Sequence, residues 1–168
     1  MLGERLAAAG LADRFVCPFL SPVPFEAMAS AEAALAHAEG PTVVVGSSLG
    51  GYYATWLAEK HDLRAVLINP AVMAPVLLSS LVGTHTNFHT GVSFEFTFEH
   101  VEQLRALSAA TVSSARYLLL VETGDEVLDY RQAVERYAGS RQVVLEGGDH
   151  SFTRFPELVP QIIEFCGL

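Results

Sequence analysis

The sequence predicts an α/β protein in which helices cover both faces of a mostly parallel sheet, and three observations lead to this prediction. Short β-branched and aliphatic runs alternate with alanine-rich helical patterns along the 168 residues. Hydrophobic residues make up 51% and charged residues 17%, which suits one domain with a substantial core. Polar turns directly follow several of the expected strands, as they do at the carboxyl ends of parallel strands. We therefore expect a single domain over residues 1–168.

The first half of the chain alternates helices with strands. Apolar residues recur at helical spacing in 2–10, 25–37 and 49–60, whereas apolar runs typical of buried strands occupy 15–20, 42–45 and 63–68. Gly10 and the prolines at 22 and 24 punctuate the first two elements, because no helix could cross 21–24. Asn69 and Pro70 end the third strand.

The second half repeats this alternation after a less regular segment. Strands are expected at 116–121 and 142–145, and helices at 99–107, 130–138 and 157–165. Between them, Leu77 to Leu81 suggest a short helix and 87–98 carries alternating aromatic residues. We expect the residues around 74–108 to form a small cap-like insertion, in the place where a segment could cover a substrate.

The stretch Gly46-Ser47-Ser48-Leu49-Gly50 is the most informative motif. It fits the pattern G-x-S-x-G, in which a strained strand-to-helix turn exposes a serine hydroxyl at the end of a parallel sheet. In this register Ser48 is the nucleophile, and the backbone N–H of Leu49 is one oxyanion donor. Both glycines are expected to supply room for the turn. A structural Gly/Ser turn without chemistry is the alternative interpretation.

Two further polar turns complete a catalytic pattern. A serine hydroxyl needs a base to take its proton, and the base needs a third group that orients it. Ser48, Asp125 and His150 follow three predicted strands in the chain order Ser, Asp, His. This is the order of the α/β-hydrolase fold, so the three residues predict that fold and a nucleophilic serine mechanism.

Other acidic residues near Asp125 have simpler explanations. Asp129 is expected at the start of the next helix, where a carboxylate commonly caps backbone N–H groups. Asp125 is preferred because it directly follows the strand. Glu122 and Glu126 are expected to be solvated turn residues.

The remaining histidines are assigned no catalytic role. His37, His61 and His100 belong to helices, where solvent exposure explains them. His85 and His89 belong to the proposed cap, where they could touch a substrate, although we favour exposed loop positions.

Composition argues against several classes of function. The formal net charge of −9 makes a nucleic-acid partner improbable, and no apolar run reaches the roughly 20 residues of a membrane helix. The first five residues lack the features of a secretory signal, so a cytoplasmic protein is expected. Cys17 and Cys166 are interpreted as buried thiols. No spacing of histidine and cysteine suggests a metal site, and no cofactor is expected.

Four blocks of sequence resemble a known family. Residues 45–57, 69–72, 123–133 and 147–152 are similar to the signature blocks of the bacterial YqiA-like esterases, a small α/β-hydrolase family. The resemblance covers nearly the whole chain. It implies a cytoplasmic hydrolase of carboxylic esters or thioesters of acyl groups, with Ser48, Asp125 and His150 as the triad. Relatives usually have Asn where this chain has Asp149, and a second carboxylate there could favour a protonated His150.

The resemblance also predicts a departure at the amino terminus. Members of the family begin with a strand and a His-Gly-Phe loop that supplies the second oxyanion N–H, whereas this sequence starts within the following helix. That strand would lie between 15–20 and 42–45, and each buried backbone group without a partner costs about 1–3 kcal/mol. We therefore expect weak or absent hydrolysis by residues 1–168 alone. The alternative function is a non-catalytic hydrolase-fold protein that binds an acyl ligand or a protein.

Overall fold

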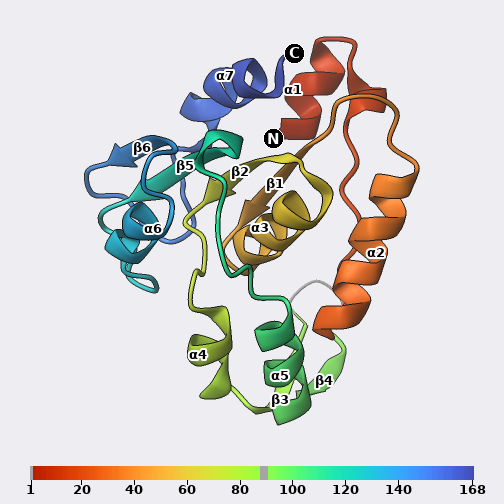
Figure 1. Ribbon diagram of the computed structural model, residues 1–168, viewed down its shortest axis with the longest axis vertical. Helices are drawn as coiled ribbons and strands as arrows, with labels where there is room; N and C mark the ends of the chain where they lie inside the picture. The colour runs from red at the N-terminus through yellow and green to blue at the C-terminus, as the bar shows by residue number, and fades with distance from the viewer. Residues whose placement is uncertain (1, 88–90) are drawn as a thin grey trace.

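Four parallel strands form the central sheet of the protein, in the order β1-β2-β5-β6 (Figure 1). They are β1 (Val43–Ser47), β2 (Arg64–Ile68), β5 (Tyr117–Glu122) and β6 (Arg141–Leu145). This computed structural model describes residues 2–87 and 91–168. The register aligns the strand ends, because Ser47 pairs with Ile68 and Glu122 pairs with Leu145. The segments that follow all four strands therefore meet at one edge of the sheet.

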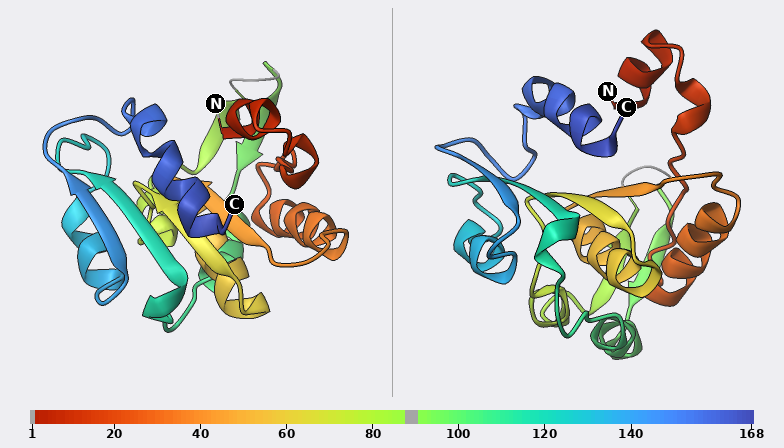
Figure 2. Two further views of the ribbon diagram at one scale, coloured as in Figure 1. Left: turned by 90° about the horizontal axis from the view of Figure 1, so that it is seen from above. Right: turned by 45° about the horizontal axis from the view of Figure 1, so that its top comes forward.

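Helices cover both faces of the sheet, as predicted. One face packs against α3 (Leu49–His61) and α6 (Tyr130–Arg136), and the other packs against α7 (Phe155–Cys166). Alternate residues of β5 divide between the two cores: Leu119 lies among the residues beneath α3, and Leu120 among those beneath α7. This division follows from the two-residue period of a strand. Figure 2 (right) shows the sheet between the two helical layers.

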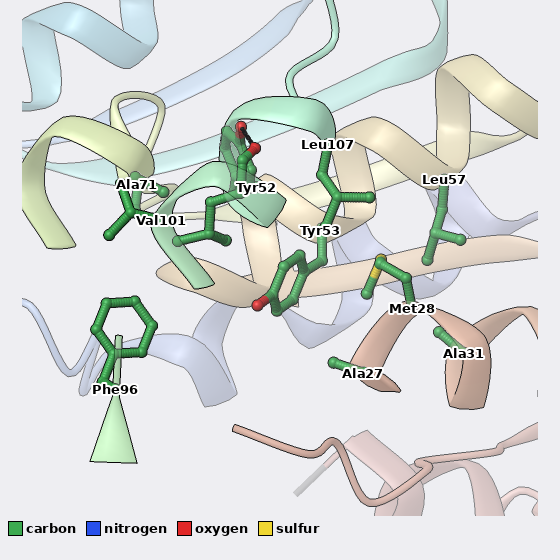
Figure 3. Close-up of a cluster of buried hydrophobic side chains, with 12 residues drawn as sticks. Ala27, Met28, Ala31, Tyr52, Tyr53, Leu57, Ala71, Phe96, Val101 and Leu107 are labelled. Atoms are coloured by element: carbon green, nitrogen blue, oxygen red, sulfur yellow. Dashed lines mark hydrogen bonds between the residues drawn. The ribbon is translucent and has the colours of Figure 1, made fainter. Parts of the chain in front are cut away.

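A third apolar cluster joins the sheet layer to peripheral elements. It lies between α3, α2 (Pro24–Ala36) and α5 (Phe98–Ala106). Figure 3 shows Met28 of α2 beside Leu57 of α3 in this cluster. The remaining short elements are α1 (Leu2–Ala8), whose Leu2 packs on the α7 side, and the 3₁₀ turns η1 (Ala12–Arg14) and η2 (Ser114–Arg116).

The chain between β2 and β5 forms a separate group of elements. It contains α4 (Ala74–Ser79), then β3 (Gly83–Thr86) paired antiparallel with β4 (Ser93–Phe96), and then α5. The sequence indicated the two helices, whereas the pairing of β3 with β4 was not predicted. Tyr52 of α3 ties this group to the main body, because its hydroxyl donates a 2.6 Å hydrogen bond to the Leu104 carbonyl.

The predicted strand at 15–20 is wrong. These residues form an irregular connection between η1 and α2, and Phe15, Val16 and Phe19 are exposed. A strand needs a neighbour that accepts and donates backbone hydrogen bonds, and Pro18 removes one donor from this run. Within residues 2–87 and 91–168 no strand pairs with the outer edge of β1. The outer edge of β1 therefore has no partner strand among the described residues.

The interpretation of both cysteines as buried thiols is also wrong. Cys17 is exposed because it belongs to this irregular connection, and Cys166 is only partly buried at the end of α7. None of the helices described within residues 2–87 and 91–168 is long and apolar enough to cross a membrane.

Candidate active site

The three residues of the predicted triad meet at the carboxyl edge of the sheet. Ser48 directly follows β1, Asp125 follows β5, and His150 follows β6. The Nε2 atom of His150 lies 3.0 Å from the Ser48 Oγ atom. Its Nδ1 atom lies 2.9 Å from Oδ2 of Asp125 and 3.0 Å from Oδ1. The prediction that His150 reaches both partners is therefore confirmed.

The surroundings of Asp125 select one form of the histidine. The Asp125 side chain is only 2% exposed, whereas that of His150 is 21% exposed. Oδ1 of Asp125 also accepts hydrogen bonds from the N–H groups of Val127, at 2.9 Å, and Leu128, at 2.8 Å. A carboxylate only accepts hydrogen bonds, so Nδ1 of His150 carries a proton, and in the neutral ring Nε2 is then the acceptor for the Ser48 hydroxyl.

The backbone of Ser48 has the strained geometry expected of the turn. Its φ of 52° and ψ of −121° lie in a region that residues other than glycine rarely adopt. Three hydrogen bonds of 3.0 Å hold it: the Ser48 N–H donates to the Ile68 carbonyl, and the Ser48 carbonyl accepts from the N–H groups of Gly51 and Ala71. Such strain costs on the order of 1–3 kcal/mol, and it persists where surrounding contacts impose it.

The expectation about the two motif glycines is correct for only one of them. A Cβ atom on Gly46 would lie 2.0 Å from the carbonyl oxygen of Gly50, so only glycine fits there. A Cβ on Gly50 would meet nothing within 4 Å outside its own helix. Gly51 is also constrained, because its Cβ would lie 2.7 Å from Pro70 Cβ. The close approach of α3 to β1 and to the end of β2 explains why these two positions require glycine.

Leu49 occupies the predicted position at the start of α3. The N–H groups in the first turn of a helix have no acceptor within that helix, and the helix dipole makes this end positive. This position suits an N–H that stabilises a developing negative charge.

The acidic residues around Asp125 differ in burial and in hydrogen-bond partners more than the sequence indicated. Asp129 caps α6 as predicted, and its side chain accepts the Arg131 N–H at 3.0 Å. Glu126 is exposed, and its Oε2 accepts the His150 N–H at 3.0 Å. The prediction for Glu122 is wrong, because this residue is fully buried.

Glu122 instead anchors the loop that carries His150. Its Oε2 accepts the Asp149 N–H at 2.7 Å, and its Oε1 accepts the Nε of Arg154 at 2.6 Å. A Cβ on Gly148 would lie 2.1 Å from the Glu122 carboxylate, so this loop needs glycine to pass over it. A buried carboxylate requires such partners. The sequence signal that could have revealed this role is a glutamate at the end of a strand that is otherwise wholly apolar.

Asp149 does not form an ion pair with His150. Its Oδ2 accepts a long hydrogen bond of 3.4 Å from Thr153 Oγ1, and its backbone carbonyl accepts one from the side chain of Asn69. Asn69 is a further residue that sequence reasoning treated only as the end of a strand.

The other histidines make local contacts. His37 is exposed and bonds to the Ala33 carbonyl, and His61, also exposed, contacts Glu32. The expectation of simple exposure is wrong for His100, which is half-buried and completes the amino-terminal cap of α5 with Thr97. His85 is half-buried in β3 rather than in an exposed loop, and His89 lies outside the described residues.

No group of three or more His, Cys, Asp or Glu side chains that could hold a metal ion occurs in the described parts of the chain.

Comparison with known proteins places the whole chain in one family. The model of Uncharacterised protein family (UPF0227) matches residues 2–167. Among solved structures, the α/β hydrolase domain-containing protein 10 from mouse superposes with a TM-score of 0.62 at 17% identity, over 84% of this chain and 68% of the mouse chain.

Two further proteins give similar agreement. Est1E from Butyrivibrio proteoclasticus has a TM-score of 0.63 at 14% identity, over 87% of this chain and 72% of its own, and another structure of Est1E holds ferulic acid. The esterase domain of a Rhodothermus marinus protein has a TM-score of 0.63 at 17% identity, over 96% and 78%. At these identities the likeness shows that the chain has the α/β-hydrolase fold.

The contacts of the two motif glycines predict opposite outcomes for two similar substitutions. Gly46→Ala should lower the free energy of unfolding by about 3 kcal/mol, because the new methyl group would collide with backbone and force β1 and α3 apart. Gly50→Ala is the matched control. It should change stability by no more than about 1 kcal/mol, since alanine favours a helix over glycine. Urea unfolding of both variants measures the difference, and equal losses would contradict the packing described for the turn.

Proposed function

Because the chain belongs to the UPF0227 family and has the α/β-hydrolase fold, we propose that it is a serine hydrolase that cleaves carboxylic esters or thioesters of acyl groups. The observation that carries the proposal is the continuous path of hydrogen bonds from Asp125 through His150 to the Ser48 hydroxyl. The strained backbone of Ser48 supports the same conclusion, since strain of this kind is common at active sites.

In the first half of the reaction, Ser48 Oγ attacks the carbonyl carbon of the substrate. Its proton passes to Nε2 of His150, and Asp125 stabilises the resulting imidazolium through Nδ1–H. The carbonyl oxygen becomes negatively charged and accepts a hydrogen bond from the Leu49 N–H. When the tetrahedral intermediate collapses, the leaving alcohol or thiol takes the proton from Nε2, and the acyl group stays on Ser48 as an ester.

In the second half, water takes the place of the leaving group. Nε2 of His150 removes a proton from the water as the water oxygen attacks the acyl carbonyl carbon. When this second tetrahedral intermediate collapses, the bond between the acyl carbon and Ser48 Oγ breaks, and Oγ takes the proton from Nε2. The products are a carboxylic acid and the free serine. The same three side chains act in both halves, and the Leu49 N–H serves as one oxyanion donor in each.

The segment 74–108 is the proposed cover for the acyl group, within a single domain over residues 1–168. It includes α4, whose Val76 and Leu77 side chains are exposed, and Leu81, shortly after the end of α4, is exposed as well. Apolar side chains of this kind suit an acyl chain, because its burial removes apolar surface from water. Est1E, with its bound ferulic acid, indicates that a small carboxylic acid is a reasonable first probe of the product site.

The first test asks whether Ser48 is a reactive nucleophile. A fluorophosphonate probe should label the protein once per chain, because the probe reacts with a serine whose proton a base removes. Ser48→Ala should abolish labelling, and the matched control Ser47→Ala, one residue earlier in β1, should retain it. Mass spectrometry of the labelled peptide identifies the site. A folded protein that binds an acyl ligand but takes up no label would favour a binding role and reject the proposed hydrolase.

A second test separates the two candidate aspartates. Asp125→Asn should lower kcat for a simple aryl ester by about 10⁴-fold, as loss of the orienting carboxylate does in serine proteases. Asp129→Asn removes the same charge four residues away but keeps a residue that caps helices equally well, so kcat should change by less than about twofold. Steady-state kinetics of the two folded variants provides the comparison. A larger loss in the Asp129 variant would assign the orienting role to the other carboxylate.

A further inference from the structure

Asn69 has an unusual backbone conformation directly after β2. Its φ is +38°, a value that residues other than glycine seldom adopt. It also precedes Pro70, and a following proline restricts the backbone of the preceding residue to extended conformations. Asparagine tolerates a positive φ better than most residues. The side chain is almost completely buried, since Asn69 is only 2% exposed. Surrounding contacts must therefore stabilise this conformation.

The side-chain amide of Asn69 supplies these contacts. Its Oδ1 accepts the N–H of Glu122 at 3.0 Å. Its Nδ2 donates to the carbonyl oxygens of Asp149, at 3.1 Å, and His150, at 3.3 Å. Both the nitrogen and the oxygen of the amide thus have partners. One side chain connects the ends of β2 and β5 with the loop that carries His150.

The backbone on either side of Asn69 holds Ser48. The Ile68 carbonyl accepts the Ser48 N–H, and the Ala71 N–H donates to the Ser48 carbonyl, both at 3.0 Å. The four-residue turn 68–71 therefore contacts the serine through its backbone and the histidine loop through its one amide side chain. The relative position of these two groups depends on this turn.

The loop that carries His150 needs such an anchor. Gly147 and Gly148 precede Asp149, and both have positive φ values, of 71° and 77°. Consecutive glycines restrict the backbone little, so the loop has a weak conformational preference of its own. Glu122 holds the Asp149 N–H, and the exposed Glu126 holds the His150 N–H. Asn69 is the residue that binds the carbonyl groups of both Asp149 and His150.

We propose that Asn69 is a positioning residue that sets the distance between Ser48 Oγ and His150 Nε2. This role rests on the proposed function, because it concerns the transfer of the serine proton. The amide is required for its chemistry as well as its shape. An aspartate would keep the acceptor for the Glu122 N–H, but its carboxylate cannot donate to the two carbonyl oxygens.

The principal variant is Asn69→Gly, because glycine accepts the positive φ and removes only the side-chain bonds. We expect kcat for a small aryl ester to fall by about 10-fold to 100-fold, since an error of about 1 Å in a reacting group can cost that much. KM should stay within about twofold, because Asn69 is buried and does not meet the substrate. Asn69→Asp, which preserves the shape of the side chain, should give a similar loss.

Gln142→Ala is the matched control. The Gln142 side chain also donates to two carbonyl oxygens, those of Val134 at 3.1 Å and Tyr137 at 2.8 Å, but it lies in β6 beside α6. Its loss should lower stability and leave kcat unchanged, provided that circular dichroism and urea unfolding show folded samples. An equal fall of kcat in the Gln142 variant would overturn the proposal, because it would show a general effect of stability.

A second measurement does not depend on turnover. Nitrogen-15 NMR of the histidine rings reports the hydrogen bonds of His150 at Nδ1 and Nε2. Asn69→Gly and Asn69→Asp should shift these resonances and speed the exchange of the Nδ1 proton with water, whereas Gln142→Ala should not. If the unaltered protein hydrolyses no ester but both Asn69 variants shift His150, the proposed function fails and the positioning role is supported. Unchanged His150 resonances and unchanged kcat in folded Asn69 variants would overturn the role of Asn69.

Discussion

The structure depends on Ser48, whose backbone conformation an isolated chain would rarely adopt. Ser48 has a φ of 52° because β1 must end and α3 must begin within a single residue. Its N–H and carbonyl are bound by the turn that follows β2, so the strain is sustained by the neighbouring strand. The same turn brings Pro70 against Gly51, and the reversal of the chain brings Gly46 against the backbone of Gly50. The parallel pairing of β1 with β2 is therefore a precondition of the position of the Ser48 hydroxyl.

Buried polar groups at the strand ends hold the loops that carry the other side chains of the site. Glu122 ends β5 in the apolar interior, where an unpaired carboxylate would be costly. The Glu122 carboxylate accepts hydrogen bonds from Arg154 and from the Asp149 N–H in the loop after β6, which offset the cost of its burial. Asn69 makes a similar connection from β2 without a charge. The loops that carry Asp125 and His150 are consequently joined to the core by hydrogen bonds, and two of the residues that join them have no assigned step in the proposed chemistry.

The irregular connection at 15–20 shows how a strand pattern can fail. Phe15, Val16 and Phe19 have the character of strand residues, and the run is short and apolar. Strand propensity nevertheless describes a side chain's fit to a pleated surface, and it supplies no partner for the backbone. Residues 15–20 pair with no described strand, Pro18 removes one backbone donor, and their apolar side chains stay partly in water.

Local patterns predicted most of the fold and the three central side chains. Alternating apolar runs and helical patterns predict where the helices and strands lie. The order Ser48, Asp125, His150 can be recognised in the sequence because each residue lies in a turn after a strand. Such information is local, since periodicity and turn chemistry involve neighbouring residues. The roles of Glu122 and Asn69 arise from contacts between residues more than 25 positions apart, which pattern and propensity do not encode. The 3.0 Å contact between Ser48 and His150 likewise required the parallel sheet, because strand register brings distant turns to one edge.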